Sequence, residues 1–128
     1  FIDRTIATAH DTRQTSTLLG RIRRLPDIAS TNHNVRQFAE RIAVNTPIQG
    51  TAADLIKMAM INTDRALRKK RMNTAMLLSV HDEMIFEVPP DELDDAKALV
   101  REGMESVWEL AVPLKVNMAC GQNWAEAH

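Results

Sequence analysis

Residues 75–88 read AMLLSVHDEMIFEV, and this stretch decides which fold the sequence predicts. Its two apolar runs, Ala75 to Val80 and Met84 to Val88, have the length and composition of buried or half-buried strands. The residues between them are His81, Asp82 and Glu83. The pattern therefore predicts a β-hairpin with these three polar residues at its tip.

The predicted turn contains no glycine, although tight hairpins normally use a glycine-bearing pair to reach positive φ. A local rule that is broken without local benefit marks a position where function is expected. A looser turn with an exposed acidic tip is the plain alternative, and His81 in such a turn would be an ordinary surface residue.

Helical patterns surround the hairpin on both sides. The predicted elements are, in order, a helix from Phe1 to about Thr12, a basic loop or short extended element from Arg13 to Ser30, a helix from the Ser30-Thr31-Asn32 cap to Asn45, a second helix or the far limb of a kinked one from Thr46 to Arg71, the hairpin, a helix from Asp91 to Trp108, and a strand from Leu114 to Cys120. This succession predicts an α+β fold, with helices packed on a small antiparallel sheet around a central β-hairpin.

The start of the second helix is read from Thr46-Pro47-Ile48-Gln49. A threonine followed three residues later by glutamine, with proline at the first helical position, is typical of a capping box. Acidic residues fill the first turn of the helix after the hairpin, at Asp91, Glu92, Asp94 and Asp95, where they match the helix dipole.

The bulk composition predicts one intracellular globular domain. The chain has 128 residues, of which 45% are hydrophobic and 26% charged. It contains no apolar stretch of the roughly 18 residues that a membrane helix needs, and no signal peptide. The single cysteine, Cys120, excludes an internal disulfide framework and a multi-cysteine zinc site. We expect a cytoplasmic protein without a membrane partner, and a piece of a longer chain, because Phe1 already lies in a predicted helix.

The net charge of −1 hides two oppositely charged halves. Residues 1–72 hold 13 Lys and Arg against 6 Asp and Glu, whereas residues 73–128 hold 3 against 11. The positive residues form short runs, at Arg21 to Arg24 and at Arg65 to Arg71, which is typical of a phosphate-binding edge. The alternative is that the two halves only neutralise each other in a scaffold.

Two groups of side chains could carry chemistry. Arg41, Asn45 and Gln49 recur every four residues, which places them on one helical stripe whose donors and acceptors can probe the groove edges of DNA. A solvated helix face is the alternative there.

Asp82 and Glu83 offer the oxygen ligands that Mg²⁺ takes, and two such ions can promote phosphoryl transfer. That chemistry needs another acidic residue, for which Asp54 and Asp64 are poor candidates because they lie inside a helix.

Five segments together carry a family resemblance. They are GRIRRLPDI (20–28), ERIAVNTPIQGTAADLIKMAM (40–60), VHDEMIFEVP (80–89), VPLKV (112–116) and GQNWAEAH (121–128). In this order they resemble the C-terminal end of the bacterial DNA polymerase I enzymes, the family A DNA polymerases. The resemblance covers essentially the whole chain, and the QGTAAD and VHDE blocks are its most specific parts.

The resemblance implies a role for each matching residue. Asp82 would be the palm carboxylate that binds two catalytic Mg²⁺ ions, Glu83 would be its less critical neighbour, and His81 would lie close to the primer terminus. Arg41, Asn45 and Gln49 would contact the minor groove of the primer–template near the insertion site. Arg21, Arg23 and Arg24 would meet backbone phosphates. The implied substrate is a deoxynucleoside triphosphate.

The chain also departs from the family pattern. The second catalytic aspartate on an upstream strand is absent, as is the fingers helix whose lysine and tyrosine hold the nucleotide, and the chain contains no tyrosine. Ser79 stands where the family often has glutamine. We therefore expect one partial domain, inactive alone, with residues 1–72 forming the end of the fingers and palm helices and residues 73–128 the palm hairpin, a helix and a C-terminal strand. It would need the remainder of the polymerase, and its unpaired sheet edge would favour self-association. A non-catalytic DNA-binding module is the alternative function.

Overall fold

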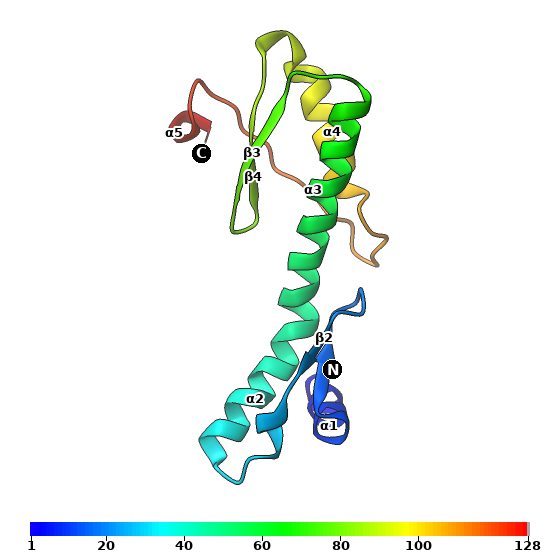
Figure 1. The fold of residues 1–128 in the computed structure, drawn as a ribbon, viewed down its shortest axis with the longest axis vertical. Helices are drawn as coiled ribbons and strands as arrows, with labels where there is room; N and C mark the ends of the chain where they lie inside the picture. Colours follow the sequence, from blue (N-terminus) through cyan, green and yellow to red (C-terminus); the bar gives the residue numbers. More distant parts are fainter. Residues whose placement is uncertain (128) are drawn as a thin grey trace. The chain divides into compact units, whose positions relative to one another are not determined.

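The computed structural model describes residues 1–127, which form two compact units. The first unit spans Phe1–Asp54 and the second begins at Leu55, so the long helix α3 (Thr51–Lys69) contributes to both. Figure 1 labels the elements of each unit. None of the helices described is long and apolar enough to cross a membrane.

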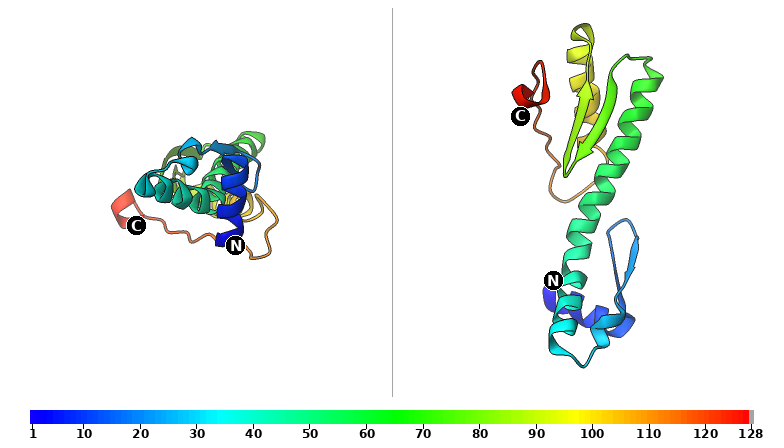
Figure 2. Two further views of the ribbon diagram at one scale, coloured as in Figure 1. Left: turned by 90° about the horizontal axis from the view of Figure 1, so that it is seen from below. Right: turned by 60° about the vertical axis from the view of Figure 1, so that its left-hand side comes forward.

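The first unit packs two helices and a small hairpin around a compact core. Its elements are α1 (Ile2–Thr12), β1 (Gln14–Ser16), β2 (Ile22–Arg24), the 3-10 helix η1 (Pro26–Ala29), α2 (His33–Asn45) and the π-helical segment η2 (Thr46–Gly50). β1 and β2 are antiparallel, with Thr15 opposite Arg23. The core consists of Ala9, Leu25, Ile28, Ala39 and Ala43, with Ile42 packed against it. The right-hand view of Figure 2 shows these elements, coloured blue to cyan, next to one another.

The predicted cap of α2 is confirmed. The side-chain oxygen of Asn32 accepts hydrogen bonds from the backbone N–H groups of Asn34 (3.0 Å) and Val35 (3.4 Å). The Ser30 hydroxyl in turn accepts from the Asn32 N–H at 3.1 Å. These bonds satisfy donors that the first helical turn would otherwise leave unpaired, so the helix begins where the sequence predicts.

Pro47 changes the helix instead of ending it, and the predicted capping box is wrong. Thr46 has helical backbone angles, and its hydroxyl donates to the Ile42 carbonyl at 2.8 Å rather than accepting from a following N–H. Proline has no N–H to donate to the Ala43 carbonyl four residues earlier. That buried carbonyl accepts instead from the Thr15 hydroxyl at 3.0 Å, so β1 supplies the missing donor. The far limb of a kinked helix, predicted as one option, is the form observed.

The second unit contains the predicted hairpin. β3 (Ala75–Val80) pairs antiparallel with β4 (Glu83–Glu87), from Ala75 opposite Glu87 to Val80 opposite Glu83, with a register shift between Met76 and Leu78. The shift places an extra residue, Leu77, in β3, and Leu77 and Leu78 are exposed where half-buried strands were expected.

Helix α4 packs on the C-terminal half of α3. It spans Leu93–Glu105, follows the 3-10 helix η3 (Pro90–Glu92), and buries Ala96, Leu99 and Val100. A Cβ on Gly103 would lie 2.7 Å from the Thr63 hydroxyl, so glycine permits this close approach. Both side views show the hairpin next to these two helices (Figures 1 and 2). The predicted fold class, helices on a small antiparallel sheet, is confirmed.

The C-terminal end differs from the prediction. No strand forms at Leu114 to Cys120. Within residues 1–127 the second sheet contains only β3 and β4. The alternation survives as half-buried Leu114, Val116 and Met118 between exposed neighbours, and the Val116 N–H donates to the Glu105 carboxylate at 3.0 Å. A short helix, α5 (Trp124–Ala127), follows this segment. The predicted helix to Trp108 also stops early, at Glu105.

Candidate nucleic-acid interface and carboxylate hairpin

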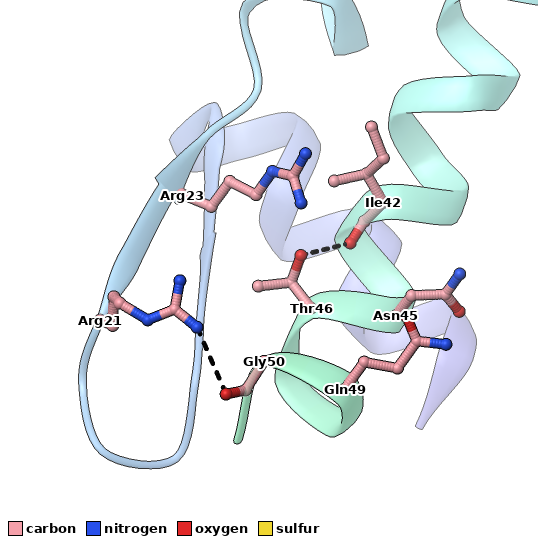
Figure 3. Close-up of a pocket in the computed structure, with 7 residues that line it drawn as sticks. All are labelled: Arg21, Arg23, Ile42, Asn45, Thr46, Gln49 and Gly50. Atoms are coloured by element: carbon pink, nitrogen blue, oxygen red, sulfur yellow. Dashed lines mark hydrogen bonds between the residues drawn. The ribbon is translucent and has the colours of Figure 1, made fainter. Parts of the chain in front are cut away.

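A pocket of about 180 Å³ opens on the first unit, and we call it the arginine–amide pocket. It lies between the β1–β2 hairpin and the helical turn at η2, as Figure 3 shows. Its lining residues are Arg21, Arg23, Ile42, Asn45, Thr46, Gln49 and Gly50. Two arginines, an asparagine and a glutamine therefore line one small space, whose donors suit a ligand rich in oxygen acceptors.

Arg21 is bonded on two sides. Its Nε donates to Asp54 Oδ1 at 2.8 Å, and its Nη2 donates to the Gly50 carbonyl at 3.3 Å, the bond drawn in Figure 3. The Asp54 side chain is only 10% exposed, whereas that of Arg21 is 53% exposed. A carboxylate so largely withdrawn from water requires such a partner. Arg21 and Asp54 together therefore form an ion pair whose charges compensate each other.

The hairpin loop that carries Arg21 is attached to the helix by further contacts. The Leu18 N–H donates to the Thr51 hydroxyl of α3 at 2.8 Å, and within the loop the Arg21 N–H donates to the Thr17 hydroxyl at 3.1 Å. Gly50 completes the contact, because a Cβ at this position would lie 2.8 Å from the Thr17 methyl group. The loop thus lies directly against the turn that carries Gln49.

Arg23 reaches the same pocket without an ion pair. It is exposed, and within the described part of the chain no carboxylate lies within 4.0 Å of its guanidinium. Asn45 and Gln49 are likewise exposed, at the end of α2 and in η2. The predicted stripe is partly assembled here, because Asn45 and Gln49 share the pocket. Arg41 lies one turn earlier on α2, outside the lining, with its guanidinium 5.7 Å from the centre of the Phe38 ring.

The three polar residues at the hairpin tip lie in the second unit. His81 and Asp82 form the turn between the strands, and Glu83 is the first residue of β4. All three side chains are exposed. His81 adopts a φ of 55°, so it supplies the left-handed conformation that glycine usually provides in a tight hairpin.

The donor chemistry of the tip fits a hard divalent cation only in part. Asp82 and Glu83 provide carboxylate oxygens, and Mg²⁺ is commonly held by one or two carboxylates with water and substrate oxygens completing its shell. Residues 1–127 contain no cluster of three or more metal-ligating side chains. A metal centre at the tip would therefore need further ligands from outside these residues.

Two carboxylates have roles that the sequence did not indicate. Asp54, a poor candidate for a catalytic carboxylate because it lies inside a helix, is on the buried stripe of α3 with Thr51 and Leu55. An acidic residue on such a stripe is a signal for a cationic partner. Glu92 accepts bonds from the N–H groups of Asn73 (2.8 Å) and Thr74 (2.9 Å) and from the Thr74 hydroxyl (2.7 Å). The Asn73 N–H, followed by the Thr74 hydroxyl, lowers the pKa of Glu92 below its ordinary value.

Relatives of known identity match the chain throughout. DNA polymerase I of Lactococcus lactis subsp. cremoris is 50% identical over 127 residues, which is 99% of this chain and 14% of that protein. DNA polymerase I of Mycobacterium bovis is 51% identical over 115 residues, which is 89% of this chain and 13% of that protein. The chain therefore spans about one seventh of these relatives.

A solved structure also matches the fold. It is described as the POL domain of Pol1 from M. smegmatis in complex with DNA primer-template and dNTP, and it is 45% identical to this chain. The TM-score is 0.96, over 98% of this chain and 22% of that one. The family model "DNA polymerase family A" matches residues 1–126. The predicted resemblance is confirmed: the chain belongs to DNA polymerase family A.

Proposed function

We propose that these residues form the C-terminal part of the polymerase domain of a DNA-directed DNA polymerase, which adds deoxynucleotides to a primer 3′ end. The observation that carries the proposal is the close structural similarity to a polymerase domain solved with primer-template and dNTP. Residues 1–72 would form the end of the fingers and palm helices, and residues 73–127 the palm hairpin with its helix. The rest of the polymerase chain, the DNA and the nucleotide are the proposed partners.

The hairpin tip is the proposed catalytic element. Asp82 and Glu83 would hold Mg²⁺, which when bound activates the attacking hydroxyl and stabilises the leaving oxygen. The family resemblance implies the principal role for Asp82, which lies in the turn, and a lesser role for Glu83, the first residue of β4. A second aspartate from the rest of the polymerase would complete the site. His81, exposed next to Asp82, would lie close to the primer terminus.

The arginine–amide pocket supports the proposed contact with the minor groove of the primer–template. Asn45 and Gln49 present exposed amides that can donate to the minor-groove acceptors found at similar positions in every base pair. Arg41 adds an exposed cation on the same helix. Such contacts check base-pair geometry without reading sequence, as a template-directed enzyme requires.

Substitution of Asp82 in the complete polymerase tests the catalytic assignment. Asp82→Ala should nearly abolish Mg²⁺-dependent primer extension and leave primer–template affinity close to that of the wild type, whereas Glu83→Ala should cost less. Glu87→Ala is the matched control, because Glu87 is an exposed carboxylate at the far end of the same hairpin. Unchanged extension by Asp82→Ala would favour a non-catalytic DNA-binding module, whose affinity would instead depend on Arg41, Asn45 and Gln49.

A further inference from the structure

The sequence groups Arg21, Arg23 and Arg24 as one phosphate-binding run, but the structure separates the first two by their partners. We propose that the Arg21–Asp54 pair is a charge-neutral positioning contact that holds the turn carrying Gln49, and that Arg23 alone supplies the pocket with a cation for a DNA phosphate. This inference rests on the proposed function, since it assigns roles within the proposed DNA interface.

The charge of Arg21 is already compensated by Asp54 within the protein. Phosphate binding gains free energy when a cation displaces condensed counterions from DNA, so each such contact steepens the salt dependence of binding. Arg21 already directs Nε to Asp54 and Nη2 to Gly50, and the Asp54 carboxylate cancels its charge at short range. Binding of a phosphate would have to compete with a largely buried carboxylate. Arg21 therefore contributes little to counterion release.

The bonds of Arg21 also hold the hairpin loop against the turn that carries Gln49. Arg21 bridges the Gly50 carbonyl and a carboxylate one helical turn further on, at Asp54. Gly50 directly follows Gln49, and the same loop contacts the helix again through Leu18 and Thr51. Loss of the ion pair would therefore leave the loop attached by the Leu18–Thr51 bond alone and allow the Gln49 amide to move.

Arg23 provides the contrast within one short segment. Residues two apart in an extended segment point to the same side, so Arg21 and Arg23 both face the arginine–amide pocket. Within residues 1–127 only the first of them has a carboxylate within 4.0 Å. Arg23 thus retains an uncompensated charge in the pocket that Asn45 and Gln49 also line.

The test measures primer–template affinity of the complete polymerase against KCl concentration, by fluorescence anisotropy, without nucleotide. Arg23→Ala should reduce the slope of log K against log[salt] by about 1. Arg21→Ala should leave the slope unchanged and weaken binding by about tenfold at every salt concentration. Asp54→Asn should also loosen the turn, but it should steepen the slope, because it leaves the Arg21 charge uncompensated. The double variant should be no weaker than either single variant, because both remove the same contact.

Lysine variants guard against effects of misfolding. Arg23→Lys should restore the salt slope, because a point charge suffices for a phosphate, whereas Arg21→Lys should behave like Arg21→Ala, because lysine cannot reach Asp54 and Gly50 in the same fork. A slope lowered by about 1 in Arg21→Ala and restored in Arg21→Lys would overturn the inference, as would additive losses from Arg21→Ala and Asp54→Asn.

Two further variants separate this inference from the proposed function. Gln49→Ala and Asn45→Ala should weaken primer–template binding if the DNA interface is correct. If neither weakens binding, the proposed interface is wrong, and the positioning contact fails with it. If they weaken binding but Arg21→Ala and Asp54→Asn do not, the interface stands and only the positioning contact is rejected.

Discussion

At the scale of single residues, Gly50 determines how closely the β1–β2 loop lies on the helix. The Thr17 methyl group occupies the space that a side chain at position 50 would need. Gly50→Ala should therefore lower the local stability of the hairpin by about 1–3 kcal/mol, the usual cost of overpacking. Hydrogen exchange of the amides of residues 14–24 would measure the loss.

The matched control for Gly50 is Thr17→Ser. Serine keeps the hydroxyl that accepts from the Arg21 N–H and removes only the methyl group. Thr17→Ser should restore most of the protection lost in Gly50→Ala. If protection stays low in the double variant, steric contact at this point is not the cause.

Glu92 makes stability depend on pH. Its carboxylate is stabilised in the folded state by the Asn73 and Thr74 donors, which lower its pKa. The contribution is therefore fully present above the ordinary, unfolded pKa of about 4.5 and is lost as pH falls through the lower, folded pKa. In Glu92→Gln the free energy of unfolding should therefore fall less steeply between pH 5 and pH 3, as measured by urea unfolding.

Asp94→Asn is the comparison for Glu92→Gln. Asp94 is an exposed carboxylate in the first turn of the neighbouring helix, and within residues 1–127 it is in no ion pair. Asp94→Asn should change the pH dependence of the free energy of unfolding less than Glu92→Gln does. Equal flattening by the two variants would show that the hydrogen bonds of Glu92 are not responsible.

At the scale of elements, the β3–β4 hairpin has a stability cost built into its tip. His81 adopts a left-handed φ of 55°, a conformation that costs residues with a Cβ about 1–2 kcal/mol and glycine almost nothing. His81→Gly should therefore stabilise the hairpin by about 1 kcal/mol, as measured by thermal unfolding, and yet reduce primer extension by the complete polymerase.

Asp82→Gly distinguishes this conformational effect from a general effect of glycine. Asp82 does not share the positive φ, so glycine there only adds flexibility to the unfolded chain and should destabilise by about 0.5–1 kcal/mol. Opposite signs for the two glycine variants would support the strain at His81. A stabilised hairpin with normal extension would instead remove the functional reason for histidine.

The elements that the sequence predicts well are those whose signals are local. The Asn32 cap and the alternation of β3 and β4 lie within the segments that they define, and the structure confirms them. The failures involve distant partners. Pro47 predicts a helix start, but Thr15, 32 residues earlier in the chain, donates to the carbonyl that proline leaves free. Leu114 to Cys120 alternates as a strand should, yet no ladder forms with it among residues 1–127.

The candidate site follows the same rule. Asn45 and Gln49 could be grouped from their spacing, and the structure brings them to one pocket. The division between Arg21 and Arg23 could not be predicted, because it depends on Asp54, which is distant in sequence from both.

At the scale of the whole molecule, the chain spans about one seventh of its relatives, which predicts that it needs the rest of a polymerase to act. The 128-residue chain alone should show no primer extension. Mixed with Lactococcus lactis DNA polymerase I truncated before the matching segment, it should restore Mg²⁺-dependent extension, and Asp82→Ala should abolish the restored activity. Extension by the isolated chain would contradict the proposed division of the catalytic aspartates.

The unpaired edges of the hairpin bear on the same experiment. Both strands pair only with each other within residues 1–127, and exposed Leu77 and Leu78 lie in β3. Open edges favour strand pairing between copies. We expect the isolated chain to self-associate in sedimentation experiments and the truncated partner to compete with that association.

The bond between Thr15 and Ala43 also has a consequence for the order of folding. During synthesis Thr15 leaves the ribosome 28 residues before its acceptor, so the β1 segment is available before the helix that depends on it. Pro47 lacks the N–H that would bond to the Ala43 carbonyl, and in the folded chain Ala43 is buried with the Thr15 hydroxyl bonded to it. We therefore expect the continuous helix from α2 into α3 to form in the same cooperative folding step as its contact with β1.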